Sequence, residues 1–197
     1  MEAALIAVLA IALVRLIALE SFRIQLASME RTLFAGDFVL VNKLQYRLTV
    51  PFIGRPLLRW QNPKINDIIV MRSPVSGATS IVKRCIAVGG QTVSFGDDGV
   101  YAARILAGSG RSDVEVRGPT RRAIPTLVKV PEGHVFVLGD NPSHSMDSRH
   151  FGPLPLDSIV GKAMVIYFSY EHGQNQPLDR RRNLLRRIRW ERIGKRL

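Results

Sequence analysis

The stretch TSIVKRCIAVGG, residues 79–90, has the composition of a β-strand that runs into a glycine turn. Five of its twelve residues are β-branched, and the Gly89-Gly90 pair at its end favours a tight turn. Because side chains alternate between the two faces of a strand, Arg84 faces one way and Lys83 the other. Lys83 shares its face with three small or apolar residues, Ile81, Cys85 and Ala87. We therefore expect the Lys83 amine to be partly removed from water.

The body of the chain contains seven similar runs, each bounded by turn residues. They are Asp37–Leu44, Asp67–Met71, Thr92–Phe95, Val100–Leu106, Thr126–Val130, His134–Leu138 and Ile159–Tyr170. Eight short strands at this spacing predict a mainly β protein, with an antiparallel sheet folded on itself as a barrel or sandwich. The polar stretch at 108–125 is predicted to be a loop or a small subdomain.

Length and composition limit the class of protein. With 197 residues, 46% hydrophobic and 22% charged, the chain is long enough for one domain and apolar enough to fill a core. The net charge of +12 is uneven, because residues 180–197 hold nine Lys and Arg against the single acid Glu191. The body is therefore not a basic protein, and we expect no nucleic-acid partner. The single cysteine, Cys85, excludes an internal disulfide and a zinc site built on several thiolates.

The first segment has the pattern of a membrane anchor. Residues 3–19 are apolar except for Arg15, and their length is close to the ~20 residues that span a bilayer. The long Arg15 side chain, near the end of the run, can reach the interface. A cleaved signal peptide and a buried helix are alternatives, but no basic segment precedes the run and no clear small-x-small site follows it. We predict an N-terminal transmembrane helix within residues 1–20.

Three segments carry residues suited to catalysis: Ser28 after the anchor, Lys83 in the strand above, and the polar run 138–149. A lone serine is usually a turn residue, and a strand lysine is usually solvated. Lysine acts as a general base only when it is neutral, and lowering its pKa from about 10.4 to about 7 costs roughly 4.6 kcal/mol. Buried lysines reach such values. A neutral Lys83 within hydrogen-bond reach of Ser28 could take the hydroxyl proton as Ser28 attacks a carbonyl.

The polar run, LGDNPSHSMDSR at 138–149, directly follows an apolar strand. One interpretation is an elaborate turn in which Asp147 pairs with Arg149 and hydroxyl groups bond to the backbone. His144 also permits a Ser/His/Asp triad, although these residue types crowded into one loop are more typical of turns. Taken alone, the run leaves both interpretations open.

Motifs follow one another in a characteristic order behind the anchor. They are Ser28-Met29-x-x-Thr32-Leu33, Gly36-Asp37-x-Val39, Asn66-Asp67-Ile68-Ile69-Val70, Lys83-Arg84 with Ile86-Ala87-Val88-Gly89-Gly90, Gly139-Asp140-Asn141, Ser145-x-Asp147-Ser148-Arg149-x-Phe151-Gly152, and Gly161-Lys162-Ala163. Together they resemble the motifs of bacterial type I signal peptidases, the membrane-bound Ser/Lys proteases that remove signal peptides from exported proteins. The resemblance covers most of residues 15–170.

This resemblance implies roles for individual residues. Ser28 falls on the family's nucleophile and Lys83 on its general base. Ser145 falls where a family serine hydrogen-bonds and orients the lysine, and Asp147 and Arg149 fall on a structural ion pair. The residues that fall near the apolar subsites for small substrate side chains are Phe22, Ile24 and Val82. No metal or organic cofactor is implied.

The resemblance also implies an organisation. A β-rich catalytic domain at 21–170 would follow the anchor at 1–20, with a small inserted β-region at about 91–130. The enzyme would be a single-pass protein of the bacterial cytoplasmic membrane, with its catalytic domain on the outer face, and would cut secretory preproteins after small-x-small sites. The positive-inside rule favours the opposite orientation, but a large domain can translocate regardless of charge.

The remaining segment, 171–197, is a basic tail. Leu184, Leu185 and Ile188 have helical spacing among arginines. This pattern favours an amphipathic helix lying on anionic lipid, with a solvated end as the alternative.

Two positions depart from the family pattern. Arg31 stands where the family usually has proline, which removes a fixed φ after the nucleophile. Leu26 stands where many Gram-negative members have a serine whose hydroxyl helps to bind the oxyanion, which leaves the Ser28 N–H as a donor.

Three other functions are alternatives to a general signal peptidase. They are a specialised conjugative-transfer or pilin-maturation peptidase, a self-cleaving Ser/Lys regulator, and a catalytically impaired, membrane-tethered binding relative.

Overall fold

A computed structural model describes residues 6, 18–49, 56–75, 79–95, 103–107, 110–114, 126–171 and 187–197. The chain divides into two units, which are described separately. Unit 1 comprises Met1–Leu26, Leu33–Gln61 and Gly161–Leu197, and unit 2 comprises Ala27–Thr32 and Asn62–Val160. The described elements are mostly β-strands in antiparallel pairs, which confirms the prediction of a mainly β antiparallel fold.

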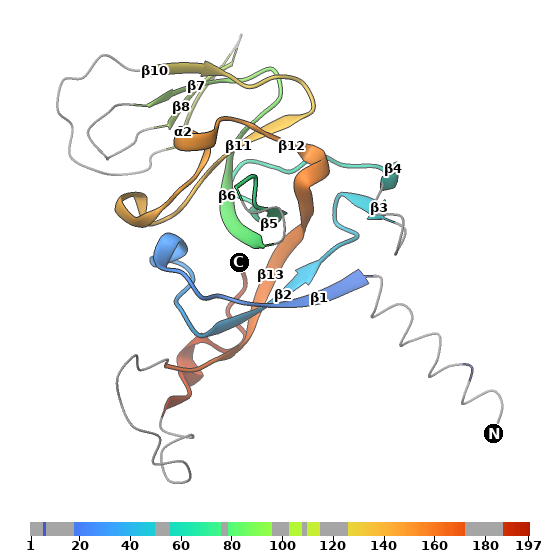
Figure 1. Ribbon diagram of the computed structural model, residues 1–197, viewed down its shortest axis with the longest axis vertical. Helices are drawn as coiled ribbons and strands as arrows, with labels where there is room; N and C mark the ends of the chain where they lie inside the picture. Colours follow the sequence, from blue (N-terminus) through green and yellow to red (C-terminus); the bar gives the residue numbers. More distant parts are fainter. Residues whose placement is uncertain are drawn as a thin grey trace. The chain divides into compact units, whose positions relative to one another are not determined.

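Unit 1 contains three strands that pair side by side and a short hairpin. They are β1 (Leu19–Arg23), β2 (Asp37–Asn42) and β13 (Ile159–Ser169), then β3 (Arg47–Thr49) and β4 (Pro56–Arg59). β2 lies between β1 and β13 and pairs with both (Figure 1). Alternate β2 residues, Asp37, Val39 and Val41, are buried, as the period of a strand requires.

The C-terminal segment 187–197 packs along β13. Tyr170 forms a β-bridge with Ile188, and Val165 forms one with Arg196. Backbone hydrogen bonds between the bridges join the two stretches further. The segment is therefore fastened to β13 by backbone hydrogen bonds and two isolated bridges.

This packing corrects the predicted amphipathic helix over the part of the tail that the structure describes. Ile188 lies in a β-bridge, and the helical turn that follows, η5 (Trp190–Arg192), is a single 3-10 turn. The physical reason is that β13 satisfies the backbone groups of this segment, which leaves no need for a helix. Leu184 and Leu185 lie outside the described residues.

A buried ion pair fastens this segment to the sheet. The fully buried Asp37 carboxylate accepts hydrogen bonds from Arg192 Nε (3.0 Å), from Ser169 Oγ (2.6 Å) and from the Phe34 N–H (2.8 Å). Arg189 Nη2 lies 3.6 Å from the same carboxylate. Burial raises the pKa of Asp37, but these hydrogen bonds and the Arg192 charge outweigh burial and hold the pKa below its usual value. Asp37 is therefore ionised at neutral pH.

Replacing Arg192 with Met should destabilise the protein, because it leaves the buried Asp37 carboxylate without its main partner. Breaking a buried pair from one side costs about 3–5 kcal/mol, and the nearby Arg189 places this case at the lower end. The measurement is chemical denaturation of the purified full chain. The double variant Asp37→Asn/Arg192→Met should recover much of the loss, whereas wild-type stability in the single variant would contradict this account.

Unit 2 contains strands of two sheets. The first has the order β5 (Ile68–Arg72), β6 (Ser80–Val88), β11 (His134–Leu138) and β12 (Leu154–Pro155); the second has the order β10 (Thr126–Lys129), β7 (Thr92–Phe95), β8 (Ala103–Ala107) and β9 (Gly110–Val114). The second sheet occupies the interval in which the sequence predicts a small inserted β-region. Short helices are η1 (Ala27–Met29), η2 (Pro142–His144), α2 (Ser148–Phe151) and η3 (Leu156–Ser158).

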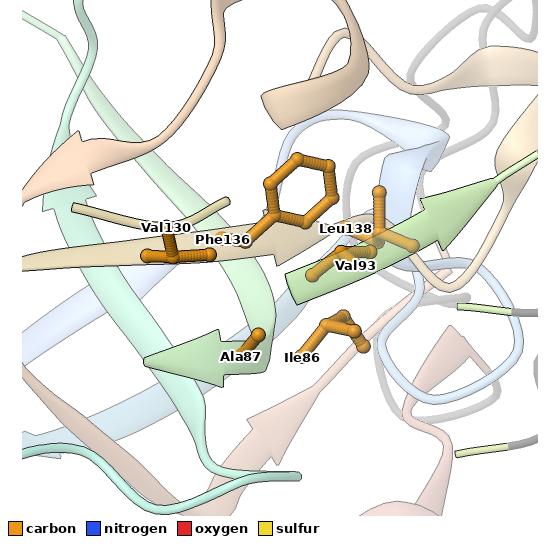
Figure 2. Packing of buried hydrophobic residues seen from close by; sticks show 6 residues of the cluster. All are labelled: Ile86, Ala87, Val93, Val130, Phe136 and Leu138. Carbon is orange, nitrogen blue, oxygen red and sulfur yellow. The ribbon is translucent and has the colours of Figure 1, made fainter. Parts of the chain in front are cut away.

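An apolar cluster joins these two sheets. Figure 2 shows its side chains gathered between β6, β7 and β11; they are Ile86, Ala87, Val93, Val130, Phe136 and Leu138. All six are nearly or fully buried. Because β6 and β11 both contribute, the cluster also fixes the two strands that carry the polar residues described below.

The predicted strand runs match strands of the structure, with small differences at their ends. The strands that the sequence does not predict are the short β3, β4 and β12, then β1, which begins at the last residue of the apolar run, and β9, which lies in the polar stretch 108–125 that is predicted to be a loop or a small subdomain. A two- or three-residue strand is too short for an alternating pattern to register.

The predicted anchor at 1–20 falls almost entirely outside the described residues. Within the described part of the chain, no helix is long and apolar enough to cross a membrane.

Candidate active site

Ser28 and Lys83 meet inside unit 2. Ser28 lies in the turn η1 and Lys83 lies in the middle of β6; their exposed fractions are 8% and 3%. Lys83 Nζ is 2.7 Å from Ser28 Oγ, within hydrogen-bond distance. The structure thus brings together two residues that lie 55 positions apart in the sequence.

The surroundings of Lys83 lower the proton affinity of its amine. Burial lowers the pKa of Lys83 to about 8, because the charged amine has lost its water. The charge of Asp147 opposes this shift, that of Arg149 adds to it, and that of Asp140 opposes it. With such a pKa, about one molecule in ten carries the neutral amine at pH 7.

Cys85 lies two residues along the same strand and is fully buried. Burial, with the Asp67 charge, raises the pKa of Cys85 to about 12. The side chain is therefore a thiol at neutral pH and does not act as a nucleophile.

The turn that carries Ser28 is held by the loop after β11. The Asn141 N–H donates to Ser28 O at 3.0 Å, and Asn141 Nδ2 donates to Ala27 O at 3.1 Å. Further along, the Thr32 hydroxyl donates to Asp140 Oδ2 at 2.6 Å. The turn that carries Ser28 is thus fastened on both sides of this residue.

Arg84 completes this fastening from the other face of β6. Its Nε and Nη2 donate to the two oxygens of Asp140 at 2.8 and 2.6 Å, and Nη2 is 3.2 Å from Thr32 Oγ1. A bidentate pair of this kind fixes orientation as well as distance. Strand alternation therefore gives neighbouring residues separate tasks: Lys83 faces Ser28, and Arg84 holds the loop.

Asp147 is the centre of the polar loop. Its fully buried carboxylate accepts hydrogen bonds from Arg149 Nε (2.6 Å), from Ser145 Oγ (2.6 Å) and from the Gly139 N–H (3.0 Å). Arg149 Nη2 donates in turn to the carbonyl oxygens of Pro142 and Ser145. The loop is therefore folded around one ion pair.

Ser145 differs from its expected arrangement. The resemblance implies a hydrogen bond from this serine to the lysine, but in the described part of the chain Ser145 Oγ bonds to Asp147, and the Lys83 amine bonds to Ser28. A hydroxyl donates preferentially to a buried carboxylate, and a protonated lysine amine offers no acceptor.

Gly139 allows the loop to approach Ser28. A Cβ at this position would lie 2.2 Å from Ser145 Oγ and 2.5 Å from Ser28 O, closer than real contacts allow. The sequence places Gly139 in a motif, but only the structure shows that its lack of a side chain is required by close packing.

The remaining predicted site residues belong to both units. Phe22 is half-buried in β1 and Ile24 is buried just after it, both in unit 1. Val82 is half-buried in β6 of unit 2. His144 ends η2, is exposed, and within the described residues makes no hydrogen bond to Ser28 or Asp147, so the structure does not support a Ser/His/Asp triad.

No group of three or more His, Cys, Asp or Glu side chains in the described ranges is placed to hold a metal ion.

Comparisons with known proteins agree on one family. The family described as signal peptidase, peptidase S26, matches residues 1–168. The chain belongs to this family. It is 34% identical to signal peptidase I T of Bacillus subtilis (strain 168), over 86% of this chain and 84% of that protein. It is 32% identical to signal peptidase I of Pseudomonas fluorescens, over 77% of this chain and 65% of that protein.

The chain therefore spans just under two thirds of the length of the Pseudomonas signal peptidase. A solved structure of a signal peptidase I from Enterococcus faecalis V583 matches 52% of this chain and 97% of that chain, with 28% identity and a TM-score of 0.41.

In this member of the signal peptidase family, the Ser28–Lys83 arrangement is suited to acyl transfer. A hydroxyl that is 2.7 Å from an amine of lowered pKa has both a nucleophilic oxygen and a proton acceptor. Arg84 could not replace Lys83, because a guanidinium does not deprotonate in proteins.

The Lys83 amine should titrate with a midpoint of about 8 in the folded protein, against about 10.4 for an unperturbed lysine. The amine loses its proton as the pH rises through this midpoint. NMR of protein labelled at the lysine side chains measures the titration, and loss of the signal in Lys83→Met assigns it. A midpoint above 10 would mean that the amine stays charged at neutral pH and would contradict the proposed lowering.

Proposed function

We propose that this protein is a signal peptidase: a serine endopeptidase that removes signal peptides from exported preproteins, with Ser28 as nucleophile and Lys83 as general base. The observation that carries the proposal is the 2.7 Å contact between a buried lysine amine and a serine hydroxyl. Membership of the signal peptidase family supports it independently.

The proposed reaction has two halves. Ser28 Oγ attacks the carbonyl carbon of the scissile peptide, and its proton passes to the neutral Lys83 amine. The C–N bond then breaks, the proton moves from Lys83 to the leaving amine, and the acyl group stays on Ser28 as an ester. Water attacks the ester, gives a proton to Lys83, and releases the acid while Ser28 recovers its hydrogen.

As Ser28 attacks, the substrate carbonyl oxygen becomes negatively charged and needs a hydrogen-bond donor to stabilise it. Leu26 offers no hydroxyl, so we assign this role to the Ser28 N–H. Ser145, Asp147 and Arg149 would act as positioning residues. Their charges and hydrogen bonds hold the loop that packs against the Ser28 turn.

Substrate and location are further parts of this proposal. Phe22, Ile24 and Val82 would line apolar subsites, and the substrate would bind as an added strand with small residues before the cut. The apolar segment at 3–19 ends nine residues before Ser28 and would hold the enzyme at a membrane as a single-pass anchor, with the catalytic domain on the outer face. Basic residues of the tail would contact anionic lipid.

Cleavage of an exported precursor that carries an Ala-x-Ala site should give one cut, directly after the second alanine. Mass-spectrometric mapping of the products measures it, with detergent-purified full chain. Ser28→Ala and Lys83→Met should each abolish the cut, because one lacks the nucleophile and the other lacks the base.

Matched controls are Ser143→Ala and Lys64→Met, which change an exposed serine of the polar loop and an exposed lysine. Both should cleave at the wild-type rate. Cleavage by the Ser28→Ala variant would contradict the proposed mechanism. No cut in any of several precursors by folded protein would favour the specialised peptidase or the impaired binding relative.

The rate of cleavage should rise with pH through the Lys83 titration. The neutral amine is the active form, so below pH 8 kcat/KM should increase about tenfold per pH unit, and it should level off above that pH. The measurement uses a peptide without groups that titrate between pH 6 and 10. A profile that is flat across this range would show that deprotonation of Lys83 does not control the rate.

A further inference from the structure

One residue, Asn141, holds both peptide carbonyls that flank the Cα of Ser28. Its backbone N–H donates to Ser28 O at 3.0 Å, and its Nδ2 donates to Ala27 O at 3.1 Å. Nδ2 also lies 3.2 Å from Glu30 Oε2 at the exposed side of the turn. Two bonds from one residue therefore fix the planes of the two peptide groups on which the nucleophile sits.

Holding the Ala27 carbonyl also orients the Ser28 N–H. The two belong to one planar, trans peptide group, so they point in opposite directions, and the N–H is directed away from Asn141. Within the described residues, the Ser28 N–H has no hydrogen-bond partner. A hydrogen bond accepted by a peptide carbonyl polarises the group and strengthens its N–H as a donor.

The turn itself supplies one bond to the Ala27 carbonyl, from the Glu30 N–H at 3.1 Å. η1 is only three residues long, and a 3-10 turn of that length has poor internal hydrogen-bond geometry. Arg31 does not restrict φ as a proline would, and Leu26 supplies no hydroxyl to share the oxyanion. Orientation of the Ser28 N–H therefore depends on the Asn141 side chain as well as on this one internal bond.

We propose that Asn141 is a positioning residue for the oxyanion site: its side chain orients and polarises the Ser28 N–H toward the carbonyl oxygen that becomes negative as Ser28 attacks. This inference rests on the proposed function, because it concerns the same reaction. Under this proposal Asn141 stabilises the transition state and has no effect on Lys83, the general base.

The test compares two substitutions at this position in the full chain. Asn141→Ala removes the Nδ2 donor and keeps the backbone N–H; Asn141→Asp keeps the shape and replaces the donor by a carboxylate oxygen facing the Ala27 carbonyl. The matched control is Asn42→Ala, because Asn42 also makes side-chain hydrogen bonds within a turn, in unit 1. Glu30→Gln tests the exposed second contact of Nδ2 alone.

Four quantities are measured for each variant: kcat, KM, the pH midpoint of kcat/KM, and the affinity for a peptide aldehyde, which forms a tetrahedral adduct with a serine hydroxyl. Rates are expressed per folded molecule from a denaturation curve. Loss of an oxyanion donor costs about 10²–10³ in kcat, and a misdirected donor should cost less, about 10- to 100-fold.

We expect Asn141→Ala to lower kcat by this factor, to weaken aldehyde binding in parallel, and to leave KM and the pH midpoint unchanged. Asn141→Asp should be at least as impaired, while Asn42→Ala and Glu30→Gln should stay within twofold of wild type. If Asn141 had a purely structural role, its loss would not lower kcat and aldehyde affinity while leaving KM and ordinary peptide binding unchanged.

Three results would overturn the inference: wild-type kcat per folded molecule in Asn141→Ala, unchanged aldehyde affinity despite a loss of kcat, or a shifted pH midpoint that accounts for the loss. If cleavage by the wild-type chain requires Ser28 and Lys83 but not Asn141, only this inference fails. If cleavage persists in Ser28→Ala, the proposed function fails first.

Discussion

A lysine amine that is removed from water must lose its proton or find a counter-charge, and the residues around Lys83 leave it between these two states. Burial to 3% exposure lowers its pKa to about 8, while the charges of Asp147 and Asp140 limit the fall. A fully exposed lysine would stay protonated, and one buried without any carboxylate nearby would shift further. The strand that carries Lys83 is paired on both sides, with β5 and with β11, so the amine is held at a fixed place beside Ser28.

The loop after β11 supplies most of what surrounds this pair. Asp147 and Arg149 fold the loop on itself, and the bidentate contact of Arg84 with Asp140 ties it to β6. Buried ion pairs add little net stability once desolvation is counted. We therefore infer that their main effect is positional: they set where Asn141 meets the Ser28 turn.

Unit 1 uses charge in a similar way at its own centre. The sequence shows a strongly basic C-terminal segment, and such segments often contact acidic surfaces. In the structure, two of these arginines turn inward: Arg192 neutralises the buried Asp37, and Arg189 donates to the carbonyl oxygens of Ala35 and Tyr170. Part of the basic character therefore serves the fold and is not available to a partner.

The sequence by itself determined the β-rich class, the places of most strands, and the residues at the candidate site. Alternation, a local and periodic signal, placed Lys83 on an apolar face, and the resemblance of the ordered motifs to a known family singled out Ser28. Only the tertiary structure decided that Lys83 contacts Ser28, that Ser145 bonds to Asp147, and that Gly139 must lack a side chain. These are contacts between segments distant in sequence or choices between competing acceptors. Their outcome depends on distances that no local pattern encodes, and the C-terminal segment departs from its predicted helix for the same reason: β13 offers its backbone a partner.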